Sequence, residues 1–340
     1  MPPAVSSAAR LPRWVVFLLA LGLSLGITIN FLPVSVFTWV GQRLPTFATV
    51  FLSLFIEAVP FLLMGTLASG LVEVFVDRDD LSRWLPRDPL RSALAGCCLG
   101  LFFPVCECGV VPLTRRLYSK GMPLPTGVAF ILAAPVLNPI VIASTLAAFG
   151  PGKVFWGRLG MTFIVALVAG LVFSVHKQPE QLLAIPPGGH ALALPVEPFQ
   201  RPPLWQGLHR VALIAADEFF EMGRYLVVGG LLAALLQTVL PQATLLSLGR
   251  GPVISVLLLI ALAVLLSVCS TVDAFIALTF AGTFTTGSVL AFLVFGPMID
   301  IKSTLMLLSL YRKRPVAYII LLPLAMIVVM TVFFNLHTPW

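Results

Sequence analysis

Long apolar runs with few or no charged side chains constrain this sequence more than any other feature. The runs Trp14–Leu32, Val253–Val272 and Val316–Leu336 contain no charged residue, and Phe155–Val175 contains one, Arg158. About 20 apolar residues in a helix cross the hydrocarbon core of a bilayer. A transmembrane β-barrel would instead alternate polar and apolar residues, which these runs do not. The sequence therefore predicts a helical membrane protein.

The composition supports the same class. Apolar residues make up 59% and charged residues 10% of the 340 positions, whereas soluble proteins carry roughly 25% charged residues. The net charge of +7 comes largely from loop Lys and Arg, so it indicates membrane orientation and predicts no nucleic-acid partner. We predict an all-α polytopic fold with about eight to ten transmembrane helices. The expected spans are 14–34, 46–75, 91–117, 122–148, 154–175, 207–239, 252–280, 286–310 and 315–336.

Loop charges also predict the location of the chain. They favour a multi-pass protein of a cell membrane, most simply the bacterial inner membrane, with a cytoplasmic N-terminus. If every expected span crosses, Arg78, Arg83 and Arg158 lie on the cytoplasmic side, and Arg115 and Lys120 lie on the other. A re-entrant segment would change this assignment. A homo-oligomer stays open at this stage.

The two halves of the chain share landmarks that lie 162 to 164 residues apart. The matched pairs are Glu57 with Glu221, Gly65 with Gly229, Cys106 with Cys269, Pro135 with Pro297, and Asn138 with Asp300. We therefore predict two membrane repeats, 43–175 and 207–340, which place a transport site at their interface. A Pro-rich linker, 176–206, joins them, and an N-terminal segment, 1–42, contains the first helix. Full crossings would make the repeats parallel, and a re-entrant segment would make them inverted.

The most specific stretch is Pro104-Val-Cys106-Glu107-Cys108-Gly109-Val-Val-Pro112, inside an apolar run. Prolines remove helix donors and Gly109 adds backbone freedom, so we expect a broken helix at membrane depth. Such a break is tolerated only inside protein or beside a water-filled cavity. The break would let the two thiols converge on a soft metal ion or metalloid. Glu107 is an ionisable group in hydrocarbon, which is costly and usually functional. The alternative is that these cysteines are small buried residues.

Three further stretches interrupt apolar runs with polar residues. They are Pro135-Val-Leu-Asn138-Pro139, Cys269-Ser270-Thr-Val-Asp273 and Pro297-Met-Ile-Asp300-Ile-Lys302. Asn138, Asp273 and Asp300 could line a polar pathway or satisfy freed backbone groups. Lys302 could pair with Asp300 or across the repeat, or snorkel to the interface.

Glu57 and Glu221 are candidates for proton coupling, because both are ionisable groups in apolar helices. The alternative for Glu221 is an ion pair with Arg224, three residues further along the helix.

The sequence contains no phosphate-binding G-x-x-x-x-G-K-[ST] loop, no H-E-x-x-H and no G-x-S-x-G. We therefore expect no enzymatic activity and no cofactor.

Together these motifs, with Lys120-Gly121 and Phe130, resemble the predicted permease family typified by YraQ and the ArsP organoarsenical permeases. The resemblance covers about residues 45–335. It implies a membrane permease with a small-molecule or ion substrate, similar to exporters of trivalent organoarsenicals and to relatives assigned to copper or zinc efflux. Glu107 stands where the resemblance leads one to expect Ser, Gly or Thr.

The resulting hypothesis is efflux of a soft metal or metalloid species, with Cys106 and Cys108 as metal ligands. Two alternatives stay open. One is a membrane thiol oxidoreductase that uses the Cys-x-Cys pair, and the other is the membrane subunit of a multi-component transporter.

Overall fold

The structure is a computed structural model that describes residues 34–86, 88–103, 105–175, 182–184, 203–239 and 251–337. The expected first span, most of the expected linker, and Pro104 lie outside the described residues. The chain divides into two compact units, 1–48 and 49–340, and the second contains almost all of the described structure. The helix bundle belongs to this second unit, which begins at Thr49.

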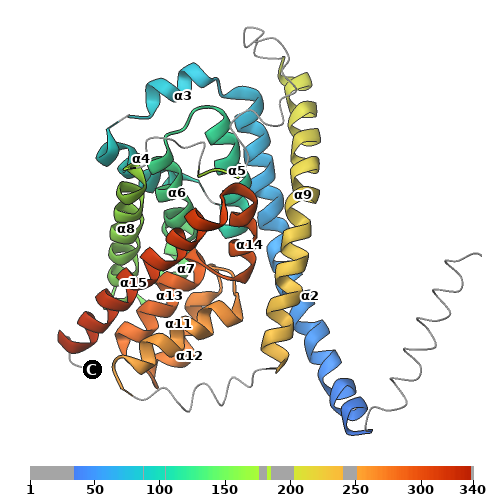
Figure 1. Cartoon of the computed structure of the whole chain (residues 1–340), viewed down its shortest axis with the longest axis vertical. Coiled ribbons are helices and arrows are strands. Elements are labelled where there is room, and N and C mark those ends of the chain that lie inside the picture. The colour runs from blue at the N-terminus through green and yellow to red at the C-terminus, as the bar shows by residue number, and fades with distance from the viewer. Residues whose placement is uncertain are drawn as a thin grey trace, which may run out of the picture. The chain divides into compact units, whose positions relative to one another are not determined.

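Every described element is a helix, apart from an isolated bridge between Leu183 and Tyr311. The helices, labelled in Figure 1, are α2 (Val34–Phe75), α3 (Arg78–Trp84), α4 (Pro89–Phe102), α5 (Glu107–Ser119), α6 (Leu124–Leu137), α7 (Pro139–Phe149), α8 (Lys153–Ser174), α9 (Leu204–Val239), α11 (Ile254–Leu266), α12 (Asp273–Ala281), α13 (Thr286–Met298), α14 (Ile301–Leu310) and α15 (Lys313–His337).

Among the described residues, six stretches are long and apolar enough to cross a membrane. α2, α8, α9 and α15 do so as single helices, and the pairs α6–α7 and α13–α14 do so as interrupted ones. Large apolar side chains such as Ile56, Phe220 and Val329 are exposed on these helices, as expected where lipid covers them. The predicted all-α polytopic membrane fold with broken helices is confirmed.

The expected span 91–117 is a re-entrant hairpin instead of a crossing. α4 has 14 residues, or about 21 Å of helix, which is shorter than a bilayer core of about 30 Å. After a break at 103–106, α5 returns to the end where α4 began. There the Lys120 ammonium donates to the Glu73 carbonyl over 2.8 Å. The Ser92 and Thr126 hydroxyls, at the starts of α4 and α6, lie 2.7 Å apart.

The expected span 252–280 is a second hairpin, formed by α11 and α12. The Ser255 and Ser288 hydroxyls, near the starts of α11 and α13, lie 2.7 Å apart. The Asn335 amide, near the end of α15, donates to the Pro252 carbonyl over 3.1 Å. The start of α15 lies at the opposite end, because the Tyr311 hydroxyl is 2.6 Å from that of Tyr118 in α5. We refer to these as the Asn335 end and the Tyr311 end.

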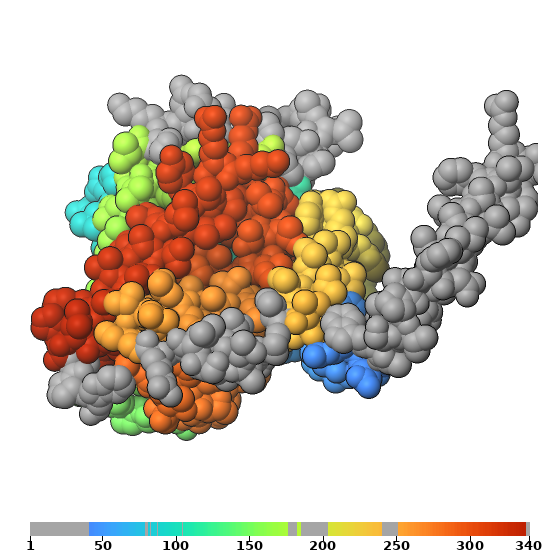
Figure 2. All heavy atoms as spheres, turned by 60° about the horizontal axis from the view of Figure 1, so that its bottom comes forward, coloured from blue at the N-terminus to red at the C-terminus, as the bar shows by residue number. Residues whose placement is uncertain are grey.

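The two hairpins therefore enter the helix bundle from opposite ends (Figure 1). The α11–α12 hairpin is seen from below in Figure 2, in orange, between α15 in red and α9 in yellow. α4, α6 and α8 pack together, as do α11, α13 and α15. Between the two groups α5 packs on α14, α12 packs on α7, and α6 packs on α13. Hairpins that enter from opposite ends are what an inverted repeat would produce. The division into repeats 43–175 and 207–340 stays a prediction.

Two glycines bring α2 and α9 onto the broken helices. A Cβ at Gly65 would lie 2.2 Å from the Cα of Gly109, so α2 meets α5 backbone to backbone. A Cβ at Gly229 would lie 2.9 Å from the Cα of Lys302, so α9 meets α14 in the same way. Only glycine allows approaches this close.

Candidate functional site at the helix breaks

Four helix breaks come together inside the bundle. They separate α4 from α5, α6 from α7, α11 from α12, and α13 from α14. The Asn138 amide of the α6–α7 break donates to the Val105 carbonyl of the α4–α5 break over 3.4 Å. The Lys302 ammonium, just past the α13–α14 break, donates to the Ser267 carbonyl of the α11–α12 break over 2.7 Å. These two freed carbonyls are thus satisfied within protein, as membrane depth requires.

The first break places the two cysteines of the Cys-x-Cys motif at the start of α5. Cys106 is the N-cap, with extended backbone, and its carbonyl accepts from the amides of Gly109 and Val110 at 3.1 and 3.0 Å. Cys108 is the second residue of the helix, and both side chains are buried. Pro112 does not extend the break, since it lies inside α5. There it removes the amide that would bond the Cys108 carbonyl.

Two of the breaks are built alike. The Asn138 side chain caps α7 by accepting from the Val141 amide at 2.9 Å. The Asp300 side chain caps α14 by accepting from the Ser303 amide at 2.6 Å, within a capping box. A buried proline, Pro135 or Pro297, stands three residues before each cap. The helix-capping geometry gives both polar residues a structural role.

Lys302 is the centre of the site. Its side chain is 2% exposed, and its Nζ lies 3.5 Å from Asp300 Oδ2 and 3.8 Å from Glu107 Oε1. The sequence suggests a pair with Asp300 or a pair with the other half of the chain. Lys302 forms both, with Asp300 and with Glu107. Ser267, which also contacts the ammonium, has a left-handed backbone with φ of 46°, a strained state for a non-glycine residue that is often found at functional sites.

Several buried oxygens at this site lack a hydrogen-bond partner. Of the buried side-chain oxygens without such a partner among the described residues, four lie here: Glu57 Oε1, Glu107 Oε2, Asp300 Oδ2 and Ser270 Oγ. Glu57 reaches this region from α2, near enough to interact electrostatically with Lys302. Buried polar atoms normally have partners. Asp300 Oδ2 has the Lys302 ammonium 3.5 Å away, whereas Glu57 Oε1 and Glu107 Oε2 could accept a proton or contact a cation.

Cys269 lies at the second break, buried like Cys106 and Cys108, and all five cysteines are free thiols. Within the described ranges, no group of three or more His, Cys, Asp or Glu side chains is arranged to hold a metal ion. The metal site at Cys106 and Cys108 stays a prediction.

A second buried ion pair, which the sequence did not reveal, lies beside this site. Arg158 in α8 donates to both carboxylate oxygens of Asp273 at the start of α12, over 3.1 and 2.6 Å, and to the Thr145 hydroxyl over 2.8 Å. The expectation that Arg158 is a cytoplasmic loop charge is wrong, because its side chain is fully buried. The sequence does contain one indication of this burial, because Arg158 is the single charged residue in the apolar run Phe155–Val175.

Glu221 forms its ion pair with Arg115 and not with Arg224, the partner that the sequence suggests. Arg115 in α5 donates to Glu221 over 2.8 Å, and the neighbouring Arg116 donates to Glu218. Arg224 instead lies over the ring of Tyr225, 5.0 Å from its centroid. These pairs attach α9 to α5. Of the two proton-coupling candidates, Glu57 has an unpaired buried oxygen and Glu221 is held in an ion pair.

Helix breaks that surround buried charges inside a membrane bundle are typical of transport proteins. A sequence model described as a predicted permease, of the ArsP type, matches residues 43–336, and the chain belongs to this family. The resemblance inferred from the motifs is confirmed, and the protein is a membrane permease.

Two relatives cover most of the chain. UPF0718 protein YcgR of Bacillus subtilis is 43% identical over 282 residues, which are 82% of this chain and 94% of the relative. A putative two-component membrane permease complex subunit of Streptococcus mutans is 36% identical over 268 residues, 78% of this chain and 87% of the relative. No solved structure matches.

Proposed function

We propose that this permease exports a soft metal or metalloid species through the site where the four helix breaks meet. The observation that supports this most directly is the position of Cys106 and Cys108 at the first break, beside the unpaired acceptors around Lys302. Thiols are suitable ligands for soft ions and trivalent arsenicals. Cys269 lies at the break of the opposed hairpin, and Glu57 carries the coupling proton. Asn138 and Asp300 hold the breaks open by capping α7 and α14.

Transport assays with the purified chain in proteoliposomes test this proposal, with methylarsenite, Cu(I) and Zn(II) as substrates. The variant Cys106→Ser/Cys108→Ser should transport the accepted substrate at least about tenfold more slowly than the wild type, because a hydroxyl is a poor ligand for a soft ion. The control Cys97→Ser/Cys98→Ser changes a neighbouring thiol pair in α4 and should transport normally. Full transport by the first variant would contradict the role of the thiols.

Two other functions give different results in the same preparation. The name of the Streptococcus relative supports a chain that works as the membrane subunit of a two-component complex. In that case the purified chain alone would move no substrate until a second component is added. A thiol oxidoreductase would instead form a disulfide between Cys106 and Cys108 or Cys269 on oxidation, which mass spectrometry detects.

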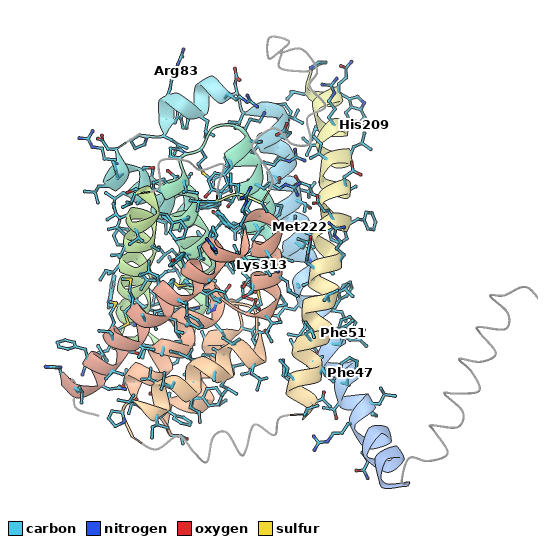
Figure 3. The ribbon with its side chains drawn as sticks, viewed as in Figure 1. Phe47, Phe51, Arg83, His209, Met222 and Lys313 are labelled. Atoms are coloured by element: carbon cyan, nitrogen blue, oxygen red, sulfur yellow. The ribbon has the colours of Figure 1, made fainter. Side chains whose placement is uncertain are left out.

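The Tyr311 end is proposed to face the cytoplasm. The α4–α5 hairpin corrects the expected assignment, because it places Lys120 at the same end as Glu73 and the neighbouring α3, which carries Arg78 and Arg83. Arg312, Lys313 and Arg314 lie at this end as well, at the start of α15. Figure 3 shows Arg83 and His209 toward one end and Phe51 toward the other. Excess Lys and Arg mark the cytoplasmic side. The expected cytoplasmic N-terminus leads to the same orientation, because a first crossing at 14–34 and a second along α2 would bring the end of α2 back to the cytoplasm.

Labelling of single cysteines with a membrane-impermeant maleimide checks the orientation, in a Cys98→Ser background that removes the exposed native thiol. Arg83→Cys should react only after the cells are permeabilised, whereas Lys153→Cys should react on intact cells. The reverse pattern would place the Tyr311 end outside.

A further inference from the structure

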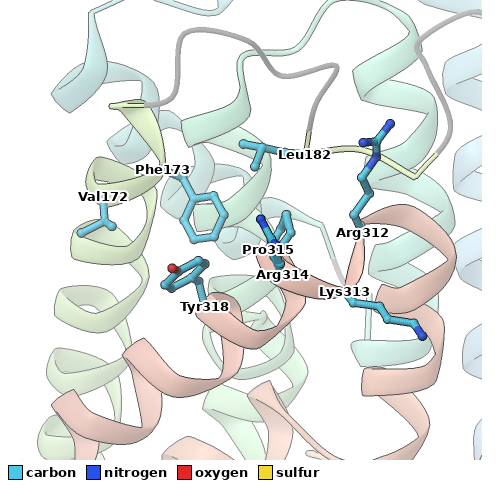
Figure 4. Close-up of a pocket in the computed structure, with 8 residues that line it drawn as sticks. All are labelled: Val172, Phe173, Leu182, Arg312, Lys313, Arg314, Pro315 and Tyr318. Atoms are coloured by element: carbon cyan, nitrogen blue, oxygen red, sulfur yellow. The ribbon is translucent and has the colours of Figure 1, made fainter.

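A cavity of about 860 Å³ lies where the end of α8 meets the start of α15, away from the helix breaks (Figure 4). Arg312, Lys313 and Arg314 line it together with Val172, Phe173 and Tyr318. Its volume falls within the range of about 300–1,000 Å³ that holds small ligands and cofactors. It is therefore large enough for a polar headgroup.

Three consecutive basic residues give this cavity a positive charge. Arg312, Lys313 and Arg314 are consecutive and exposed, and none forms an ion pair with a described acidic side chain. Other basic residues at the same end differ in this respect, since Arg115 and Arg116 have glutamate partners. The positive end of the α15 dipole adds to the field, because α15 begins at Lys313. The cavity thus attracts an anion.

Two of the side chains that line the cavity are exposed at the surface of the helix bundle. Val172 is 45% exposed and Tyr318 is 63% exposed, on two helices that are long enough to span a membrane. Tyr318 lies near the start of α15, and tyrosines near the ends of membrane-spanning helices commonly sit at the level of lipid headgroups. A ligand that suits the whole cavity has an anionic group beside the cations and an apolar chain along Val172 and Tyr318.

From this combination we propose that the cavity binds the headgroup of an anionic phospholipid. The phosphate contacts Arg312 and Arg314, and an acyl chain follows the outer surface of α8 and α15. A basic pocket between transmembrane helices is a recurrent form of lipid headgroup site. The proposal is independent of the transported substrate, because none of the residues at the helix breaks lines this cavity.

Native mass spectrometry of the full chain, taken from nanodiscs of equal parts phosphatidylglycerol and phosphatidylcholine, tests the proposal. The wild-type protein should retain phosphatidylglycerol in preference to phosphatidylcholine. The variant Arg312→Gln/Lys313→Gln/Arg314→Gln should lose at least about tenfold of this preference, given the usual contribution of each basic residue at a membrane surface. Arg312→Lys/Arg314→Lys should keep most of it, which shows that a loss reflects charge and not misfolding.

A matched control removes three basic residues from the same end of the molecule. Arg78→Gln/Arg83→Gln/Arg91→Gln lies outside the cavity and should keep the wild-type preference. An equal loss in this control would overturn the proposal, because it would reduce the effect to general surface charge. Equal retention of both lipids by the wild type would also overturn it. So would displacement of the lipid by excess inorganic phosphate, which would identify a free-anion site.

Discussion

Lys302→Met is expected to abolish transport and to destabilise the protein by about 3–5 kcal/mol, the usual cost of breaking a buried ion pair by removing one partner. The ammonium faces Glu107 and Asp300, and it also satisfies the Ser267 carbonyl. Its loss leaves two buried carboxylates without their cation in a region that already has unpaired acceptors. Thermal unfolding in detergent and proteoliposome transport measure the two effects.

The control for this prediction is Lys313→Met, which removes the same charge from an exposed position and should unfold like the wild type. The double variant Lys302→Met/Glu107→Gln separates stability from function. It removes one uncompensated acid, so it should regain part of the lost stability while transport stays absent. Transport by this double variant at the wild-type rate would show that Lys302 and Glu107 are structural and that substrate passes elsewhere.

The positions of the helix breaks could be predicted from local sequence. Pro135 with Asn138, and Pro297 with Asp300, carry a missing donor followed three residues later by a capping side chain, and both breaks occur there. Whether a broken helix continues or turns back is not a local property. α4 reverses into α5, and this direction depends on contacts such as Lys120 with Glu73 and Ser92 with Thr126. For this reason local sequence predicts crossings at 91–117 and 252–280, where the structure has hairpins.

The same distinction applies to the candidate site. Glu107, Asp300 and Lys302 stood out in the sequence because charges in apolar runs are costly unless they are paired. Which charges pair depends on how distant elements pack. Local sequence could therefore suggest the pair of Lys302 with Asp300, two residues away, but could not identify Glu107 as the second partner. Arg158 resembled a loop charge because it lies near the start of a helix. Its burial follows from Asp273, which comes from the other half of the chain.

Arg158→Met should cost about 3–5 kcal/mol of stability, since it leaves the Asp273 carboxylate buried without a cation. Arg158→Met/Asp273→Leu should restore most of that stability, because replacing a buried ion pair by apolar side chains of similar volume is often neutral or stabilising. Thr145 keeps its hydrogen bond to the Val141 carbonyl in both variants. Thermal unfolding of the two variants and of wild-type protein in the same detergent gives these differences.

Transport by the double variant decides what this ion pair does. Both Asp273 oxygens are engaged by Arg158, whereas Glu107 and Asp300 each have one oxygen without a hydrogen-bond partner. Arg158→Met/Asp273→Leu should therefore recover transport along with stability, in contrast to Lys302→Met/Glu107→Gln. That outcome would assign the Arg158 pair to holding α12 against α8 and would confine the pathway to the Lys302 side. A stable double variant that transports nothing would instead place Asp273 in the substrate pathway.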